Sequence, residues 1–309
     1  MYCIYMIEHR GLHALEAVAE HETVTAAAAA LNFTPSAVSQ QIAQLSDELG
    51  APLLQRQGRR VRLTEAARVL LQRAQQLSTL WEETKAEITD PSTVPASQLR
   101  LCGVSSAIAA LLAPATACLN RTYPQLEVSV IEEETTDCYR LLALDTADIA
   151  VVLPTQDSPP RSDPRFEQRT IAEDKQDVLV PAGHPLAERA TVELAELAAE
   201  PWIAKRHDND TFSLLTAACA SAGFTPHIVH EAKEWYAISA LVSASLGLCL
   251  LPRVVPVPAE HHVVRIPLHG PVAPTRQFVA SVRRGSSEHP LIRLGLHTLT
   301  ALANQEPAR

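Results

Sequence analysis

The feature that most constrains the fold is the segment from Thr34 to Gly50, which carries both a start and a stop signal for a helix. Thr34 is a typical N-cap residue, and Pro35 suits the first helical position, where the N–H that proline lacks would have no helical partner. Gly50 suits the end, because glycine readily adopts the left-handed conformation that terminates helices. The apolar residues between them recur every three or four positions and predict one buried face: Val38, Ile42, Leu45 and Leu49.

Two further helices are predicted before this segment. Leu12, Leu15 and Val18 form an apolar stripe, while Thr23 can cap an alanine-rich helix over residues 25–30. Residues 32–34 then make a tight turn into the helix that begins at Pro35. The face of that helix opposite its apolar stripe is small and polar: Ser36, Ser39, Gln40 and Ala43. The order of these elements predicts a helix-turn-helix.

Basic residues cluster directly after the third helix. Residues 52–56 and 61–64 bracket a short hairpin whose tip, residues 57–60, is basic. From Leu54 to Arg73 there are six arginines against one acid, Glu65, although the whole chain has a net charge of -9. Local positive charge of this kind is typical of a surface that binds nucleic acid. The segment therefore predicts a winged helix-turn-helix; the alternatives are a plain helical bundle and a solvated arginine cluster.

The predicted DNA contacts follow from how a helix enters the major groove, where its N-terminal residues meet the base edges. Residues on the outward face there are Pro35, Ser36, Ser39 and Gln40, and the Gln40 amide can pair with adenine. Arg59 and Arg60 at the tip of the hairpin suit the narrow minor groove. The residues expected to hold phosphates are Thr34, Arg56 and Arg62.

A long helix is predicted after the hairpin. Apolar residues alternate in steps of four and three, as in a coiled coil: Leu63, Ala67, Leu70, Ala74, Leu77, Trp81, Thr84 and Ile88. The alternative is one core helix of a globular domain. We favour a dimerisation helix, with contacts from Leu63, Leu70, Leu77, Trp81 and Ile88. Residues 90–96 follow as a linker with two prolines.

The pattern beyond the linker alternates between strand and helix, which predicts an open, mostly parallel sheet. Strands are predicted at 99–104, 126–132, 148–153, 176–181, 202–205, 227–229, 249–252 and 278–283. Helices are predicted at 107–122, 137–144, 191–198, 212–222, 235–245 and 290–303.

Composition and cysteine usage point to the cytoplasm. The six cysteines form no C-x-x-C pair and sit mostly in apolar surroundings, as expected of buried thiols in a reducing compartment. Residues 1–7 are too short and too uncharged for a signal peptide, and no run of about 18 apolar residues predicts a membrane span. Met6 is a candidate for the true start, because patterned sequence begins just after it, and Met1 is the alternative. The chain is not expected to contact a membrane.

Enzyme signatures are lacking from the sequence. G-x-S-x-G, H-E-x-x-H and a glycine-rich phosphate loop do not occur. We therefore expect no enzyme activity, no catalytic residues, no metal and no cofactor.

With these residues in place, the chain resembles the LysR-type transcriptional regulators. The match is dense in Thr23-x-Thr25-Ala26-Ala27-Ala28-x-x-Leu31, Ser36-Ala37-Val38-Ser39-Gln40-Gln41-Ile42-x-x-Leu45 and Leu49-Gly50-x-x-Leu53-Leu54-x-Arg56. It continues through Tyr123-Pro124, Asp148-Ile149-Ala150, His184-Pro185-Leu186, Pro201-Trp202-Ile203 and Gly247-Leu248-x-Leu250-Leu251-Pro252. Gln40 stands where the family often has arginine, which removes one cation from the reading helix.

The resemblance implies a multidomain α plus α/β architecture. A winged helix-turn-helix DNA-binding domain is expected over 8–65, a coiled-coil dimerisation and linker helix over 66–89, and an effector-binding domain over 98–303. The last is expected to resemble periplasmic binding proteins. Its lobe I would take about 98–169 and 270–303 and its lobe II about 170–269, with a ligand cleft between them.

The resemblance also implies where a small-molecule effector binds. Ser106 and Thr135 align with family effector contacts, and the neighbouring residues expected in the cleft are Ser105, Thr136, Lys205, His207 and Trp235. The cationic loop after residue 204 and a helix N-terminus favour an anionic metabolite. The alternatives are that Ser105 and Thr136 only cap helices, that Lys205 is a solvated loop residue, and that Trp235 belongs to a core or an interface.

The function implied is that of a sequence-specific transcriptional regulator controlled by this effector. Its expected partners are double-stranded promoter DNA, a second copy in a homodimer or homotetramer, and RNA polymerase. The alternative is a solute-binding module without a role in transcription. The predicted N-terminal DNA-binding module argues against this alternative.

Overall fold

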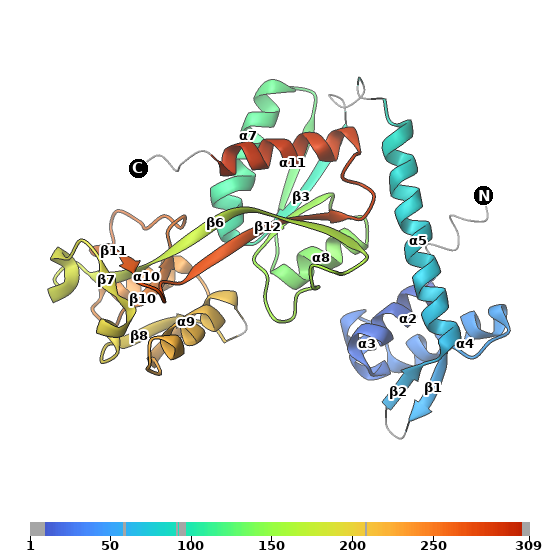
Figure 1. The fold of residues 1–309 in the computed structure, drawn as a ribbon, viewed down its shortest axis with the longest axis horizontal. Helices are drawn as coiled ribbons and strands as arrows, with labels where there is room; N and C mark the ends of the chain where they lie inside the picture. Colours follow the sequence, from blue (N-terminus) through green and yellow to red (C-terminus); the bar gives the residue numbers. More distant parts are fainter. Residues whose placement is uncertain (1–9, 58–59, 91, 93–96, 208, 305–309) are drawn as a thin grey trace. The chain divides into compact units, whose positions relative to one another are not determined.

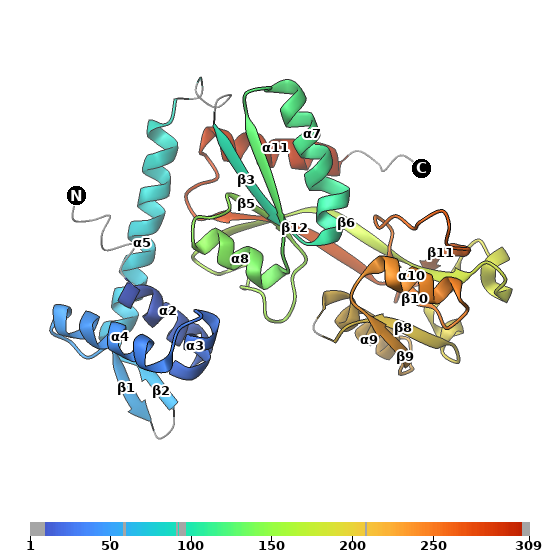
Figure 2. The same ribbon diagram turned by 180° about the vertical axis from the view of Figure 1, so that it is seen from behind.

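The structure, a computed structural model, describes residues 10–57, 60–90, 92, 97–207 and 209–304 (Figures 1 and 2). These residues divide into two units at Glu87 and Ile88, and each unit is described by itself. The expectations for Met6 and for Arg59 lie outside the described residues.

The N-terminal unit contains the predicted winged helix-turn-helix. Its elements are α2 (Arg10–His21), α3 (Val24–Ala30), α4 (Pro35–Leu49), β1 (Leu54–Gln57), β2 (Arg60–Leu63) and α5 (Glu65–Ile88). Both predicted caps are confirmed: Thr23 Oγ1 accepts a hydrogen bond from Ala26 N, and Thr34 Oγ1 accepts one from Ala37 N. Gly50 ends α4 with φ of 65°, in the left-handed region that glycine tolerates best.

The core of this unit joins the three short helices to the hairpin and to the start of α5. Val38, Ile42 and Leu45 are buried there, as the apolar stripe of α4 predicts. The prediction for Leu49 is wrong, since its side chain is 49% exposed. Leu49 is the last residue of α4 and adjoins the Gly50 cap, where the chain turns away toward the hairpin.

The apolar seam of helix α5 starts later than predicted, although the helix itself begins at Glu65, one residue before the expected residue 66. Leu63 was expected to begin the helical seam but lies in β2, because it pairs with Leu54 across the antiparallel hairpin. Thr64 then caps the helix by accepting a hydrogen bond from Ala67 N at 3.1 Å. Ala67 is fully buried in the core of the unit, whereas Ile88 is 73% exposed. The seam therefore serves the core of the winged helix at its start, and further along it contains the half-buried Leu77 and the exposed Trp81 and Ile88.

Lobe I of the C-terminal unit is built on the predicted βαβαβ pattern. Its elements are β3 (Gln98–Gly103), α6 (Ser105–Ala107), a π-helical turn (Ile108–Leu112), α7 (Ala113–Thr122), β4 (Glu127–Glu132), α8 (Thr135–Ala143), β5 (Ile149–Val152) and the C-terminal α11 (Pro290–Ala303). Strand β3 pairs in parallel with β4 and with β5. Helices α7 and α11 cover one face of the sheet and α8 covers the other (Figure 1).

Lobe II continues the alternation around one end of an eight-stranded sheet that it shares with lobe I and around a separate two-stranded sheet. Its elements are short 3₁₀ turns (Pro185–Glu188 and Leu194–Leu197), β7 (Val192–Glu193), β8 (Pro201–Lys205), α9 (Asp210–Ser221), β9 (His227–Ala232), α10 (Trp235–Ser243), β10 (Cys249–Pro252) and β11 (Val263–His269). The prediction of a regular helix over 191–198 is wrong, because a two-residue strand and a 3₁₀ turn occupy this segment. Strand β11 was not predicted.

Two long strands, β6 (Phe166–Pro181) and β12 (Thr275–Arg283), pair antiparallel and run from one lobe into the other (Figures 1 and 2). Ile171 and Phe278 pack in the core of lobe I, while Val178 packs in the core of lobe II. The chain therefore passes between the lobes at about residues 172–177 on its way out. That is a few residues beyond the predicted boundary between residues 169 and 170.

Candidate functional site

The exposed face of α4 is formed by the residues that the sequence singled out. Pro35, Ser36, Ser39 and Gln40 are all exposed, and Thr34, the N-cap, is exposed beside them. Thr34 Oγ1 lies 3.0 Å from Ser36 Oγ, so the cap and the first turn are held together. The free backbone N–H groups of a helix start attract phosphate oxygens, and this face adds hydroxyl and amide groups that can read bases.

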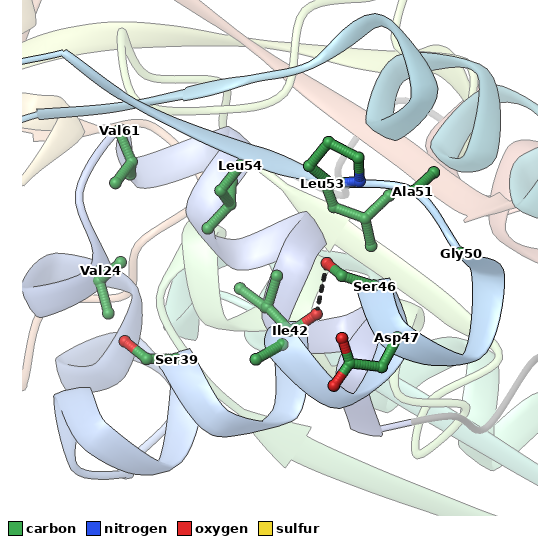
Figure 3. Close-up of a pocket in the computed structure, with 12 residues that line it drawn as sticks. Val24, Ser39, Ile42, Ser46, Asp47, Gly50, Ala51, Leu53, Leu54 and Val61 are labelled. Carbon is green, nitrogen blue, oxygen red and sulfur yellow. Dashed lines mark hydrogen bonds between the residues drawn. The ribbon is translucent and has the colours of Figure 1, made fainter.

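A hollow of about 640 Å³ separates α4 from the hairpin (Figure 3). Val24, Ile42, Leu53, Leu54 and Val61 make much of its lining apolar, and Ser39, Ala43, Ser46 and Asp47 line it from α4. Ser46 Oγ donates a hydrogen bond to Ile42 O at 2.9 Å, so this hydroxyl is used within the helix. An aspartate at the hollow disfavours phosphate there, which leaves the N-terminal half of α4 as the part suited to DNA.

The hairpin places the backbones of three of the predicted arginines. Arg56 lies in β1, Arg60 and Arg62 lie in β2, and Arg62 is exposed. In the register of the hairpin, Arg62 is opposite Gln55. A basic strand next to the reading helix is the arrangement expected of a wing that neutralises phosphates.

Helix α5 exposes apolar side chains along the second part of the predicted seam. Trp81 is 40% exposed and Leu77 is half-buried, while Leu80, outside the seam, is 58% exposed. Exposed apolar residues at heptad spacing are what a second helix would cover in a coiled coil.

Four of the predicted effector residues meet in a cleft between the lobes. One hollow of about 250 Å³ is lined from lobe I and from lobe II: Glu134, Thr135, Thr136, Thr155, Gln156, Asp157, His207, Asn209, Asp210 and Ser213. A second hollow, of about 230 Å³, shares Glu134 and Asn209 with the first and adds Lys205, Arg206 and Lys233. The cleft thus has an acidic compartment and a cationic one, which the sequence did not predict.

Two of the predicted hydroxyls are already engaged. Thr135 Oγ1 donates to Leu153 O at 2.8 Å, which fastens the start of α8 to the end of β5. Ser106 Oγ, nearly fully buried, accepts a hydrogen bond from Arg276 Nη2 at 3.3 Å. Ser105 begins α6 and lines neither hollow.

Lys205 and Trp235 form a pair at the cationic compartment. The Lys205 ammonium lies 4.8 Å from the centroid of the Trp235 ring and donates a hydrogen bond to Lys233 O. Burial lowers the pKa of Lys205, although nearby carboxylates oppose this shift. The lysine is therefore a held, largely desolvated cation and not a solvated loop residue.

The residue that sequence reasoning missed is Arg276, on β12. Its buried guanidinium is bonded to both lobes, since Nη2 lies 3.3 Å from Ser106 Oγ in lobe I and Nη1 lies 2.9 Å from Asp210 Oδ2 in lobe II. Nη2 also lies 2.6 Å from Asp174 Oδ2 on β6. The signal was present, because a charged residue in a strand must be paired when it is buried. Its partners, however, are 102 and 66 residues away along the chain, so sequence spacing does not identify them.

The described residues contain no group of three or more histidine, cysteine or acidic side chains arranged to hold a metal ion. Within the same residues, no helix is both long enough and apolar enough to cross a bilayer. Of the cysteines that the structure describes, Cys102, Cys138, Cys219 and Cys249 are buried free thiols and Cys118 is half-buried.

Comparison with known families agrees with this architecture. Residues 9–68 match the family described as the bacterial regulatory helix-turn-helix protein, lysR family, and residues 92–303 match the LysR substrate binding domain. The chain is 32% identical over 262 residues to LrrA of Synechococcus elongatus, a probable HTH-type transcriptional regulator, with 83% of this chain and 86% of that protein covered. It is 26% identical over 239 residues to the HTH-type transcriptional regulator CysL of Bacillus subtilis, with 77% and 78% covered.

Solved structures share the fold over nearly the whole chain. A full-length OxyR variant from Pseudomonas aeruginosa superposes with a TM-score of 0.63 at 18% identity, covering 94% of this chain and 96% of that one. Full-length CbnR in complex with its target DNA superposes with a TM-score of 0.57 at 19% identity, covering 96% and 100%.

Proposed function

This chain belongs to the LysR family of transcriptional regulators, and we propose that it reads operator DNA with the N-terminal half of α4. The observation that carries this proposal is the capped, fully exposed start of that helix beside a basic hairpin. Ser36, Ser39 and Gln40 would meet base edges in the major groove. Thr34 and Arg62 would hold phosphates together with Arg56, and Arg59 and Arg60 would enter the minor groove.

We propose that the second domain senses a small molecule in the cleft between its lobes. Concave sites at such boundaries are where ligands usually bind. Thr136 and His207 line the cleft from different lobes, and Lys205 supplies a held cation. Ser106 and Thr135, whose hydroxyls are engaged, would shape the cleft, with Trp235 behind Lys205 as an aromatic support.

For assembly we propose a homodimer, or a homotetramer, paired through α5. Leu70 lies near the core of the winged helix, so the pairing contacts would come from Leu77, Trp81 and Ile88. Effector binding would alter the angle between paired DNA-binding units, and so the access of RNA polymerase to the promoter. The protein would act in the bacterial cytoplasm, where the DNA is.

A mobility-shift experiment tests the proposal. The full chain should retard duplexes that it selects from a random pool, and candidate metabolites should change the pattern of retardation. A chain that binds metabolites but retards no DNA at any salt concentration would instead support a solute-binding module.

A further inference from the structure

The Arg276 guanidinium sits where three segments of the C-terminal unit meet. Nε and Nη2 both donate to Asp174 Oδ2, on the neighbouring strand β6. Nη2 also donates to Ser106 Oγ in lobe I, and Nη1 donates to Asp210 Oδ2 and to Thr211 Oγ1 in lobe II. Arg276 on a strand that runs between the lobes therefore ties both lobes together.

The two carboxylates that share this cation are not equivalent. The Asp174 side chain is fully buried and accepts two hydrogen bonds from the guanidinium, so it is the permanent counter-ion. The Asp210 side chain is 14% exposed, lines the hollow between the lobes, and accepts one hydrogen bond from the guanidinium, from Nη1, and a longer one of 3.5 Å from Thr211 Oγ1. Asp210 is also the first residue of α9, so no strand pairing depends on the position of its side chain.

Building on the proposed effector cleft, we propose that Asp210 competes with the carboxylate of an effector for Arg276. The ligand carboxylate would take the place of Asp210 on Nη1, while Asp174 keeps its two hydrogen bonds to Nε and Nη2. A ligand lacking an anionic group cannot replace Asp210, because it would leave a buried guanidinium with one partner lost. The site therefore takes a small anion, and we assign a carboxylate because the group that it replaces on Nη1 is one.

The exchange also gives the ligand a way to change the domain. Asp210 holds the start of α9, in lobe II, to a strand shared by both lobes. When the ligand takes its place, that ion pair is released, and the start of α9 keeps only the neutral hydrogen bond from Nη1 to Thr211 Oγ1 among its described bonds to Arg276. Differential contacts of this kind are what a ligand needs in order to shift a conformational equilibrium.

The test uses acetate as the probe and the full chain as the protein. Melting temperatures are measured against rising sodium acetate, with sodium chloride at equal ionic strength as the reference, and give an apparent affinity. Asp210→Asn removes the competing charge and should bind acetate about tenfold more tightly than the unaltered chain, as the loss of one competing charge-assisted hydrogen bond would give. Asp210→Ser should also raise the acetate affinity. Because serine also suits a helix start, this variant replaces Asp210→Asn in the test if Asp210→Asn folds poorly.

Two controls isolate the Arg276 contact. Asp137→Asn removes a carboxylate from the first turn of α8 that pairs only with Arg140 of the same helix, and should leave the acetate affinity unchanged. Adding Arg276→Gln to Asp210→Asn should abolish the gain in acetate affinity. The Asp210 variants should not bind ethylammonium, which is of similar size to acetate and of opposite charge, more tightly than the unaltered chain does.

An acetate affinity that is unchanged in both Asp210 variants would overturn the inference, as would a gain that survives Arg276→Gln. Neither readout involves DNA. If the chain retards promoter DNA but its Asp210 variants bind acetate no more tightly, only the competition between Asp210 and the effector is refuted. If the chain retards no DNA, only the proposed regulatory function is refuted.

Discussion

Thr34 Oγ1 accepts a hydrogen bond from Ala37 N at 3.2 Å, which fixes the first turn of the helix that we propose to read DNA. An identical cap, from Thr23 to Ala26 N at 3.1 Å, starts the preceding helix, whose role is structural. Each threonine therefore makes a stabilising contact of the same kind, but only Thr34 is proposed to contact DNA as well.

Replacing either threonine with alanine should cost about 1 kcal/mol in the free energy of unfolding of the N-terminal unit, because one helix N–H loses its side-chain partner. Chemical denaturation of the full chain measures this cost. Thr34→Ala should in addition weaken DNA binding, and Thr34→Ser should restore both properties. Equal loss of DNA affinity in Thr23→Ala and Thr34→Ala would contradict a direct role for the Thr34 region.

Arg62→Ala should weaken DNA binding almost equally for all sequences. Each neutralised phosphate contributes about 0.9 to the slope of log affinity against log salt concentration, so the slope should fall by about one. Arg59→Ala is expected to act in the same direction. Fluorescence anisotropy over a salt series measures the slope, and Arg121→Ala, an exposed arginine of the C-terminal unit, is the matched control. An unchanged slope in Arg62→Ala would refute the wing contact.

The elements predicted well from the sequence are those whose signals are local. The start and end of α4 depend on Thr34, Pro35 and Gly50, all within the helix or next to it, and the parallel βαβαβ unit depends on short apolar runs. The first half of β6, residues 166–175, was missed because it is mostly polar and shows no strand-like alternation. Its pairing with β12, far along the chain, makes it a strand.

The cleft could be located from the sequence but its chemistry could not. Thr136 and His207 were predicted there and do line one hollow. Arg276 was missed because its partners Asp174, Asp210 and Ser106 come together only when the lobes fold. The prediction that Leu63 belongs to the helical seam was wrong for a related reason. The heptad pattern of α5 continues into the strand before it, and only the pairing of Leu63 with Leu54 shows that Leu63 lies in a strand and not in the helix.

Breaking the exposed part of the α5 seam should dissociate the assembly. Leu77→Asp and Ile88→Asp each place a charge where a partner helix would bury it, and both variants should sediment as monomers. Gln72→Asp, on the opposite side of the same helix, should keep the mass of the unaltered chain in sedimentation velocity. If both seam variants keep that mass as well, α5 does not hold the chains together.

The buried thiols should resist alkylation in the folded chain. Burial raises the pKa of Cys219 and that of Cys249 to about 12 from a model-peptide value of 9.0. A hydrogen bond with Cys102, together with burial, raises the pKa of Cys138. For Cys219 and Cys249, a pKa of about 12 leaves about a thousandfold less thiolate at about pH 8 than the ordinary pKa would, so each thiol begins to react only at higher pH.

Iodoacetamide followed by peptide mass mapping checks this expectation. Among the described cysteines, half-buried Cys118 should be labelled first and the other four only after denaturation. Labelling of Cys219 or Cys249 in the native chain as fast as Cys118 would contradict it.

The central claim is that the exposed face of α4 reads DNA sequence. Repeated selection of bound duplexes from a random pool tests it most directly, with the full chain and Gln40→Ala compared in parallel and Gln76→Ala on α5 as the control. The account predicts that the unaltered chain and Gln76→Ala enrich one motif of two related half-sites. Gln40→Ala should lose about 1–3 kcal/mol of discrimination at one base pair in each half-site. A pool that gains no motif, or a motif that Gln40→Ala reads as well as the unaltered chain, would contradict it.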